Sequence, residues 1–193
     1  MKKFLTLIAV ALFVIISVTS AKDGTGFQKD NLYIGPTVGY TSYFSEGTIG
    51  FGGHAEYGLM DKVVIGSFNG SIGIGADINY ASKSIPFGYG EWSYSLLSVR
   101  LFAAYHFSPK NDFDPYVRLG FGYDNVSAKV TYNDGWLSGY NSSAGYGSGV
   151  GFSGDVGFNY HFSNSMSARL CVGWPFLLTA GLDFTLANMG WQK

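Results

Sequence analysis

The amino-acid sequence predicts an all-β chain: a transmembrane, antiparallel, up-and-down β-barrel of eight strands, preceded by a cleaved signal peptide. Three observations lead to this prediction. The first 21 residues have the features of an export signal. Apolar residues recur with a period of two in eight later segments, and charged residues avoid the apolar register of those segments. The composition agrees, with 18% aromatic residues, 28 glycines and only 13% charged residues.

The chain begins with a segment typical of a secretory leader. Lys2 and Lys3 precede an apolar run over 4–18, and small residues follow at 19–21, so we expect cleavage after Ala21. An uncleaved anchor helix is the alternative, but the run is shorter than the ~20 residues that a helical span needs. The expected organisation is a signal peptide at 1–21, an N-terminal periplasmic segment at 22–30, a barrel domain at 31–187 and a C-terminal tail at 188–193.

Charge and cysteine content narrow the function classes. Removing two lysines with the leader leaves 10 of the 12 basic residues against 13 acidic ones, a net charge of about −3. No basic patch indicates a nucleic-acid partner. Cys171 is the only cysteine, so the chain has no disulfide framework and no thiolate metal cluster. No cofactor is expected.

The first four predicted strands alternate apolar residues with small or polar ones, as strands with one apolar face do. Glycine, serine and charged residues fill the opposite register. These segments, with representative residues of the apolar face, are 32–40 (Leu32, Ile34, Val38), 49–59 (Ile49, Phe51, Tyr57), 71–81 (Ile72, Ile74, Ile78) and 97–107 (Leu97, Val99, Leu101, Tyr105).

The last four predicted strands show the same alternation. The final segment shows the alternation most clearly, because Asp183 lies within an otherwise apolar segment but in the same register as Thr179 and Gly181. These segments are 116–124 (Val117, Leu119, Phe121), 146–162 (Val150, Phe152, Val156, Phe158), 166–174 (Met166, Leu170, Val172) and 176–186 (Phe176, Leu178, Leu182, Phe184). An even number of strands lets both ends of the chain emerge on the same side of the barrel.

The connections alternate in length. Short polar turns follow the second, fourth and sixth strands, although residues 63–70 make the first of them longer or irregular. Longer loops follow the third strand, at 82–92, and the fifth, at 131–146. Short turns on one side and longer loops on the other are typical of outer-membrane barrels, with the short turns in the periplasm.

The charges show which face meets lipid. Arginine or lysine on the lipid side at mid-bilayer costs ~2–4 kcal/mol. A soluble barrel would instead carry many lysines and glutamates outside, and these strands have almost none. Aromatic residues near the strand ends, such as Tyr57, Tyr105 and Phe107, match interface girdles. The polar register therefore predicts a lumen filled by side chains, with a charge network of Glu56, Asp77, Arg100, Arg118, Asp155, Arg169 and Asp183. Within it, we expect Arg100 near Asp77 and Arg169 near Asp183.

The strand number, the loop asymmetry and the last strand resemble the small outer-membrane barrels represented by OmpX, the OmpA transmembrane domain and the opacity proteins. Thr179, Gly181, Phe184 and Leu186 match that family's C-terminal assembly signal in order. The resemblance implies residence in the outer membrane of a Gram-negative bacterium and insertion by the outer-membrane assembly machinery. One departure is that family members often end on the terminal aromatic residue, whereas this chain continues through "ANMGWQK".

Three function classes remain open at this point. We favour a monomer, in contact with outer-membrane lipids, that has a structural or adhesin-like role. Loops 82–92 and 131–146 are the candidate surface for an extracellular ligand, and the alternative for the second loop is an aromatic interface girdle with a flexible loop and no specific ligand. Candidate contacts are Tyr132, Trp136, Tyr140 and Tyr146, because Tyr, Trp, Ser, Gly and Asn recur in binding loops. A narrow pore and a lipid-modifying enzyme are the alternatives. The enzyme is disfavoured because His54, His106 and His161 lie low in the barrel and lack metal-ligand spacing.

Overall fold

The structure is a computed structural model that describes residues 26–44, 47–107, 112–133, 142–145 and 147–186. The predicted signal peptide, residues 22–25 of the N-terminal segment and the C-terminal tail at 188–193 lie outside these residues. Within them, no helix has both the length and the apolar character needed to cross a membrane.

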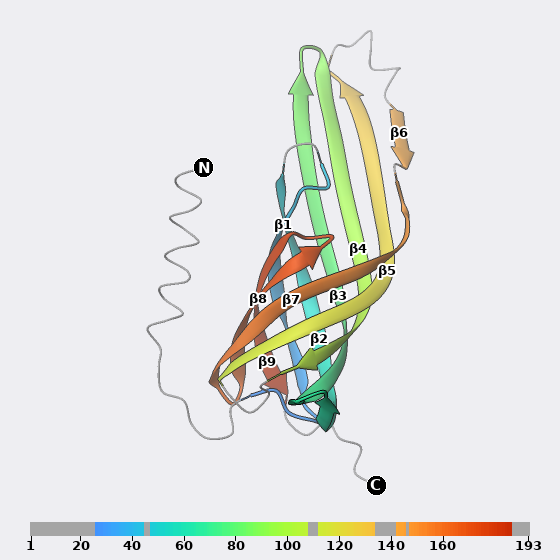
Figure 1. The fold of residues 1–193 in the computed structure, drawn as a ribbon. Coiled ribbons are helices and arrows are strands. Elements are labelled where there is room, and N and C mark those ends of the chain that lie inside the picture. Colours follow the sequence, from blue (N-terminus) through green and yellow to red (C-terminus); the bar gives the residue numbers. More distant parts are fainter. Residues whose placement is uncertain (1–25, 45–46, 108–111, 134–141, 146, 187–193) are drawn as a thin grey trace.

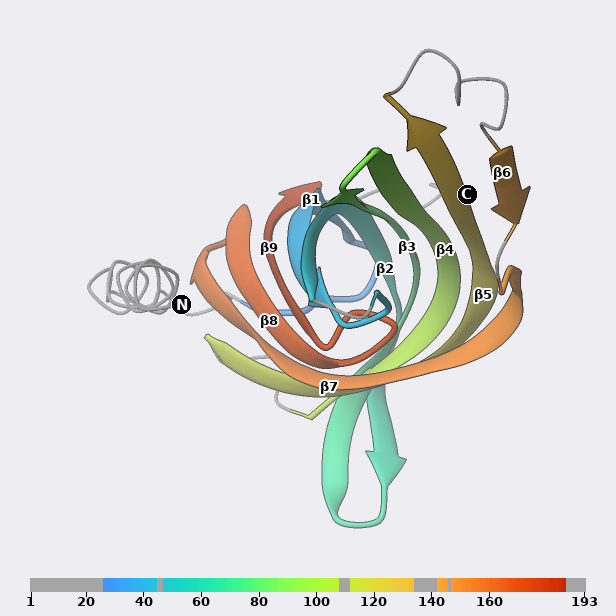
Figure 2. The same ribbon diagram turned by 90° about the horizontal axis from the view of Figure 1, so that it is seen from above.

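In the part of the chain that the structure describes, nine strands form a single antiparallel sheet (Figure 1). They are β1 (Leu32–Thr41), β2 (Thr48–Ile65), β3 (Phe68–Phe87), β4 (Gly90–His106), β5 (Phe113–Tyr132), β6 (Ser142–Gly145), β7 (Gly149–Ser163), β8 (Met166–Trp174) and β9 (Leu178–Leu186). Because β1 pairs with both β2 and β9, and β5 joins β4 to β7, eight of them close into a ring. The short β6 pairs only with the upper part of β5, outside the ring (Figure 2).

Ring closure explains the alternation in the sequence. Successive side chains of a strand point to opposite faces, so one register faces out and the other faces the lumen. The apolar register is exposed on the outside, with Leu119 71% and Phe152 88% accessible. The polar register is buried, and Arg100, Arg169 and Asp183 are each 3% accessible or less. The eight-strand barrel predicted from the sequence is therefore confirmed.

The prediction of a loop at 82–92 is wrong. These residues continue β3 and β4 as a hairpin that keeps pairing up to Phe87 opposite Gly90, with Gly88 and Tyr89 at the turn. The outward register changes from apolar residues to Ser82 and Ser84, which looks like the end of a strand if that face is assumed to meet lipid throughout. β5 likewise runs on to Tyr132, so the start of the expected loop at 131–146 is also strand.

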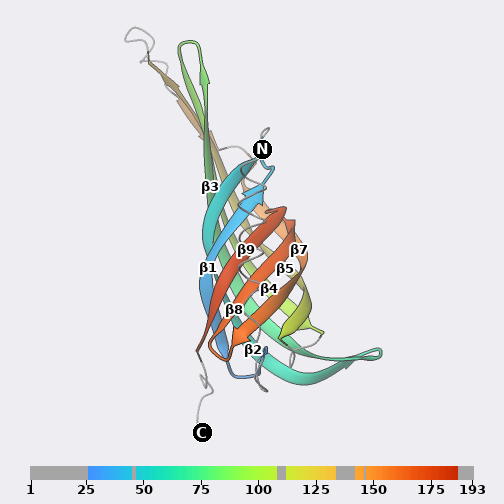
Figure 3. The same cartoon turned by 90° about the vertical axis from the view of Figure 1, so that its left-hand side faces the viewer.

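The opposite end of the barrel carries a second long hairpin. β2 and β3 pair beyond the ring as far as Ile65 opposite Phe68, with register irregularities between Gly58 and Met60 and between Met60 and Val63. The irregularity expected over 63–70 is present, but as bulges in a continuous hairpin rather than as a loop. Figure 3 shows this hairpin leaving the barrel sideways.

A closed sheet has no free edge in the barrel wall at which unfolding can begin. We therefore expect the folded mature protein to migrate in SDS gels at a mobility different from that of the boiled protein. Electrophoresis with and without boiling measures this. Identical mobility would contradict a closed barrel.

Candidate functional site

The seven residues predicted for the lumen network come from seven different strands, β2 to β5 and β7 to β9, and all point into the ring. Glu56, Arg100, Arg118, Arg169 and Asp183 are buried, and the side chains of Asp77 and Asp155 are 14% and 12% accessible. Strand alternation alone placed these side chains inside. Which charges pair depends on the geometry of the folded barrel.

Arg118, on β5, is the centre of the network. Its Nε lies 2.7 Å from Asp155 Oδ1, and its Nη2 donates to Asp155 Oδ2 at 3.0 Å, which makes a bidentate pair. Its Nη1 lies 3.3 Å from Asp77 Oδ2. The guanidinium also stacks over the ring of Phe102, with its carbon 4.5 Å from the ring centroid. Arg118 therefore joins β3 and β7 across the lumen.

The expected proximity of Arg169 and Asp183 is confirmed. Arg169 Nη1 lies 3.6 Å from Asp183 Oδ2 on the neighbouring strand β9. Arg169 also lines a small cavity of about 30 Å³ with Asp77, Arg100, Arg118 and other lumen residues. That volume holds about two water molecules.

Arg100 and Asp77 lie near each other, as expected, but their charged groups bind other partners. The two residues face each other in the register of β3 and β4, but the Arg100 side chain leans toward the outer end of the barrel. There its Nε donates to Ser98 Oγ at 3.1 Å, and its Nη2 pairs with Asp124 of β5. Asp77 instead binds Arg118 and His54. Alternation gives the face of a side chain, and the direction in which it leans along the strand decides the partner.

Two histidines, His54 and His106, extend the network toward the periplasmic end. His54 lies 2.7 Å from Asp77 and 3.4 Å from Glu56, and His106 lies 2.8 Å from Glu56 and 2.6 Å from Asp114. A continuous chain of charged and ionisable groups thus runs from Asp155 to Asp114. Asp114 and Asp124 are members of the network that were not predicted from the sequence. Asp124 was in the polar register of its segment, whereas Asp114 lay in an expected turn.

The N-terminal segment closes the periplasmic mouth. Phe27 is 2% accessible, and its ring stacks on His106 at 3.7 Å and on Tyr33 at 4.8 Å between centroids. Tyr33 Oη donates to the carbonyl oxygen of Gly26 and accepts from the amide of Gln28. A side chain at Gly73 would collide with the Phe27 ring and the Glu56 carboxylate. Residues 26–30, expected simply to precede the barrel, therefore place an aromatic plug inside it.

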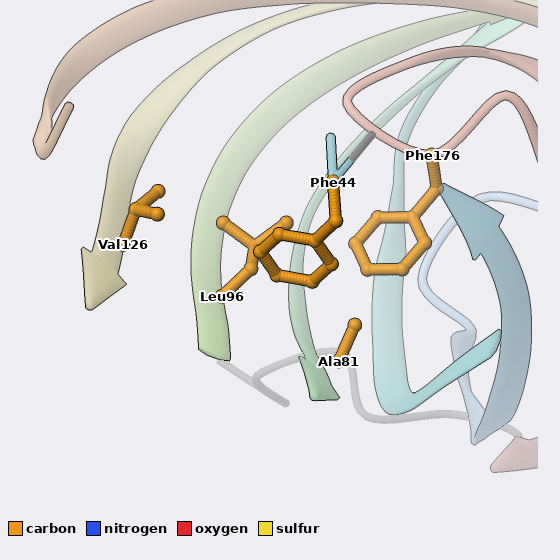
Figure 4. Close-up of a cluster of buried hydrophobic side chains, with 5 residues drawn as sticks. All are labelled: Phe44, Ala81, Leu96, Val126 and Phe176. Atoms are coloured by element: carbon orange, nitrogen blue, oxygen red, sulfur yellow. The ribbon is translucent and has the colours of Figure 1, made fainter. Parts of the chain in front are cut away.

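An apolar cluster closes the outer mouth (Figure 4). The expectation that Phe176 begins the last strand on the lipid face is wrong. β9 begins at Leu178, and Phe176 lies in the connection from β8, where it is 6% accessible. Phe176 and Phe44 of the β1–β2 connection point into the mouth together and pack on the buried side chains of β3, β4 and β5, which are Ala81, Leu96 and Val126.

Above this cluster, β3, β4, β5 and β6 continue as a sheet that projects beyond the rest of the barrel (Figures 1 and 3). We call it the projecting sheet and define its strand segments as 82–87, 90–96, 125–132 and 142–145. In it the polarity of the two faces is reversed relative to the membrane-spanning wall. The outward register carries Ser82, Ser84, Ser93, Ser95, Ser127, Lys129 and Thr131. The inward register is mostly apolar and carries, besides Lys83, Ile85, Phe87, Trp92, Tyr94, Leu96, Val126, Val130 and Tyr132.

The predicted surface contacts are only partly within the described residues. Tyr132 ends β5 on the inward face of the projecting sheet, where its ring contacts Phe87 edge-on at 5.8 Å. Trp136, Tyr140 and Tyr146 lie outside the described residues. The structure adds Trp92 and Tyr89, 43% and 67% accessible, to the exposed aromatic residues at this end. Both lie within 82–92, which was predicted from the sequence as a ligand-binding region but without individual candidate residues.

The residues of the predicted assembly signal all lie in β9. Phe184 and Leu186 are on the outward face, each 45% accessible. Thr179 and Gly181 share the inward register with Asp183. Their role as an assembly signal stays a prediction.

The architecture has known counterparts. The outer membrane protein beta-barrel domain family matches residues 8–173, which is most of the chain. The chain belongs to this family. It is a small outer-membrane β-barrel protein of a Gram-negative bacterium.

Solved structures share the fold at low sequence identity. The crystal structure of Ail, the attachment invasion locus protein of Yersinia pestis, aligns with a TM-score of 0.55 and 10% identity over 82% of this chain and 100% of Ail. Ail in complex with the heparin analogue sucrose octasulfate gives 0.56, also at 10% identity and with the same coverage. The N-terminal β-barrel domain of Pseudomonas aeruginosa OprF gives 0.50 and 16% identity over 82% of this chain and 98% of that domain. No curated protein sequence matches this chain.

The central position of Arg118 predicts a large cost for its removal. Arg118→Met leaves the carboxylates of Asp77 and Asp155 buried without their cation, and breaking such a pair costs about 3–5 kcal/mol. We expect the free energy of unfolding in urea, measured in lipid vesicles, to fall by that amount. The control is Lys129→Met on the exposed outer face, which should change it by less than about 0.5 kcal/mol. Equal effects of the two substitutions would contradict the assignment of Arg118 as the centre of the network.

Proposed function

We propose that this protein is a non-conducting outer-membrane barrel that binds an extracellular ligand on the inward face of its projecting sheet, an adhesin-like role. The single observation that carries the proposal is the reversal of polarity in that sheet. In the barrel wall the register that faces the barrel axis is polar, whereas in the projecting sheet the same register is mostly apolar and aromatic.

The lower part of this face is covered, because Phe44 and Phe176 pack on Ala81, Leu96 and Val126. Farther out on the same face, Val130 is buried, whereas Trp92 is 43% accessible. Exposed tyrosine and tryptophan are typical of binding surfaces, since they give large contact area at a low entropic cost.

The charge of the sheet bears on the kind of ligand. Among its described residues the cationic side chains are Lys83 and Lys129, which lie on opposite faces. Ail has been crystallised with a sulfated heparin analogue, but two separated lysines offer little charge to a polyanion. The aromatic face instead favours a ligand with apolar surface, such as the sugar rings and side chains of a glycoprotein.

The pore alternative has less support. Phe27 and Tyr33 fill the periplasmic mouth, and Phe44 and Phe176 fill the outer one. The lumen cavity between them holds about two waters, and charge pairs cross the space around it.

The enzyme alternative also has less support. A lipid-modifying enzyme needs a histidine near the outer face of the membrane, beside a nucleophile. His54, His106 and His161 are buried inside the lumen, and His54 and His106 are each held between two carboxylates. Within the described residues, no group of three or more His, Cys, Asp or Glu side chains is arranged to hold a metal ion.

The test is adhesion of cells that display the protein to surfaces coated with mucin, as a glycoprotein probe, or with heparin, as a polysulfated one. We expect adhesion to mucin, reduced by more than about fivefold in Trp92→Ser, because truncating an anchoring aromatic residue costs more than ~1 kcal/mol. Replacing 133–146 by a short turn should also reduce adhesion. The matched control is Ser93→Ala, which changes the polar face of the same strand and should bind as the parent protein does.

Adhesion that is absent on mucin, or present but unchanged in Trp92→Ser, would contradict the proposal. Stepwise conductance of the purified protein in planar bilayers would favour the pore. A mass change in co-incubated lipid A would favour the enzyme.

A further inference from the structure

The hairpin formed by residues 60–69, at the periplasmic end, takes no part in the lumen or in the projecting sheet. We call it the periplasmic hairpin. It leaves the wall at the two register irregularities of β2, where Lys62 has a φ of 58°, and it turns at Gly66, which has a φ of 62°. Bulges of this kind bend a strand away from its sheet. Figures 2 and 3 show the hairpin extending outward from the ring rather than continuing along the barrel axis.

Side chains of the wall hold the hairpin in this position. Tyr105, which lies in the outward register of β4, places its Oη 3.0 Å from the carbonyl oxygen of Val63 and 3.2 Å from that of Phe68. The ring of Phe68 packs edge-on against Phe107 at 5.3 Å between centroids. A side chain at Gly70 would collide with the Tyr105 ring and the His106 carbonyl. The outward bend is therefore a fixed part of the fold.

The surface that the hairpin presents is apolar. Met60 is 48% accessible, Val64 67%, Ile65 54% and Phe68 54%. The neighbouring charges lie at its root, where Asp61 accepts a hydrogen bond from Ser71 and Lys62 is exposed. An isolated hairpin in water would gain nothing from such a tip, because side chains of this kind stabilise a structure only when they leave water.

This apolar surface is continuous with the lipid-facing wall. Phe68 packs on Phe107, and Phe107 packs on Tyr105 at 5.0 Å. Tyr105 is in the outward register of β4, Phe107 directly follows the last residue of that strand, and both belong to the aromatic girdle expected at the periplasmic interface. We propose that the periplasmic hairpin inserts its tip, Val64 and Ile65, into the periplasmic leaflet of the outer membrane. Its occupant is phospholipid, and Lys62 at the root lies where a lysine can reach headgroup phosphates.

The experiment attaches an environment-sensitive fluorophore to single introduced cysteines in the full mature chain, reconstituted in vesicles of phosphatidylethanolamine and phosphatidylglycerol. The test position is Val64→Cys, at the tip. Asn164→Cys, in the exposed turn between β7 and β8 at the same end, is the aqueous control, and Leu119→Cys, on the wall, is the lipid control. The parent protein is the labelling blank, because its Cys171 is 4% accessible.

We expect the fluorophore at 64 to resemble the one at 119. Its emission should be blue-shifted, and its quenching by spin-labelled lipid should exceed that at 164 by several-fold, with iodide quenching in the reverse order. Quenching by iodide equal to that at 164 would overturn the proposal. Blue-shifted emission without quenching by the labelled lipid would also overturn it, because that result would mean that protein covers the tip.

Discussion

The rest of the structure depends on the absence of hydrogen-bonding solvent in the hydrocarbon core of the membrane. Every backbone amide and carbonyl of a spanning segment must find a partner within the protein, and a sheet achieves this only by closing on itself. Closure through the pairing of β1 with β9 then fixes the side on which each residue lies. A charge in the outward register would meet lipid, so the charges of the wall lie inside, where they must satisfy one another.

The narrow interior that results is filled by charged side chains that pair with one another. Arg118 bridges two strands through Asp77 and Asp155, and the histidines carry the network on to Asp114. Aromatic residues from segments outside the ring close both ends, Phe27 below and Phe44 and Phe176 above. Within the described residues, two parts of the sheet extend beyond the ring, the projecting sheet and the periplasmic hairpin.

The sequence was sufficient to predict the face of each side chain where one register meets lipid and the other meets the lumen. It was insufficient where the surroundings of a strand change along its length. The inward position of Glu56 and Asp183 followed from the register alone. The partner of Arg100 did not, because it depends on the lean of the side chain toward Asp124. The hairpin at 82–92 was mistaken for a loop, because Ser82 and Ser84 occupy a register that is apolar only where it meets lipid. The positions of Phe27 and Phe176 depend on contacts far along the chain, which no local pattern contains.

The central claim is that one uninterrupted register passes from lipid into water along the same strand. Spin labels at Ser93, Ser95, Leu97, Val99 and Leu101, all on the outward face of β4, test it through their relative collision rates with oxygen, which concentrates in lipid, and with a water-soluble nickel chelate. The account predicts oxygen-dominated collisions at the three apolar positions and a change to nickel-dominated collisions at the two serines. Nickel-dominated collisions at all five positions would contradict it.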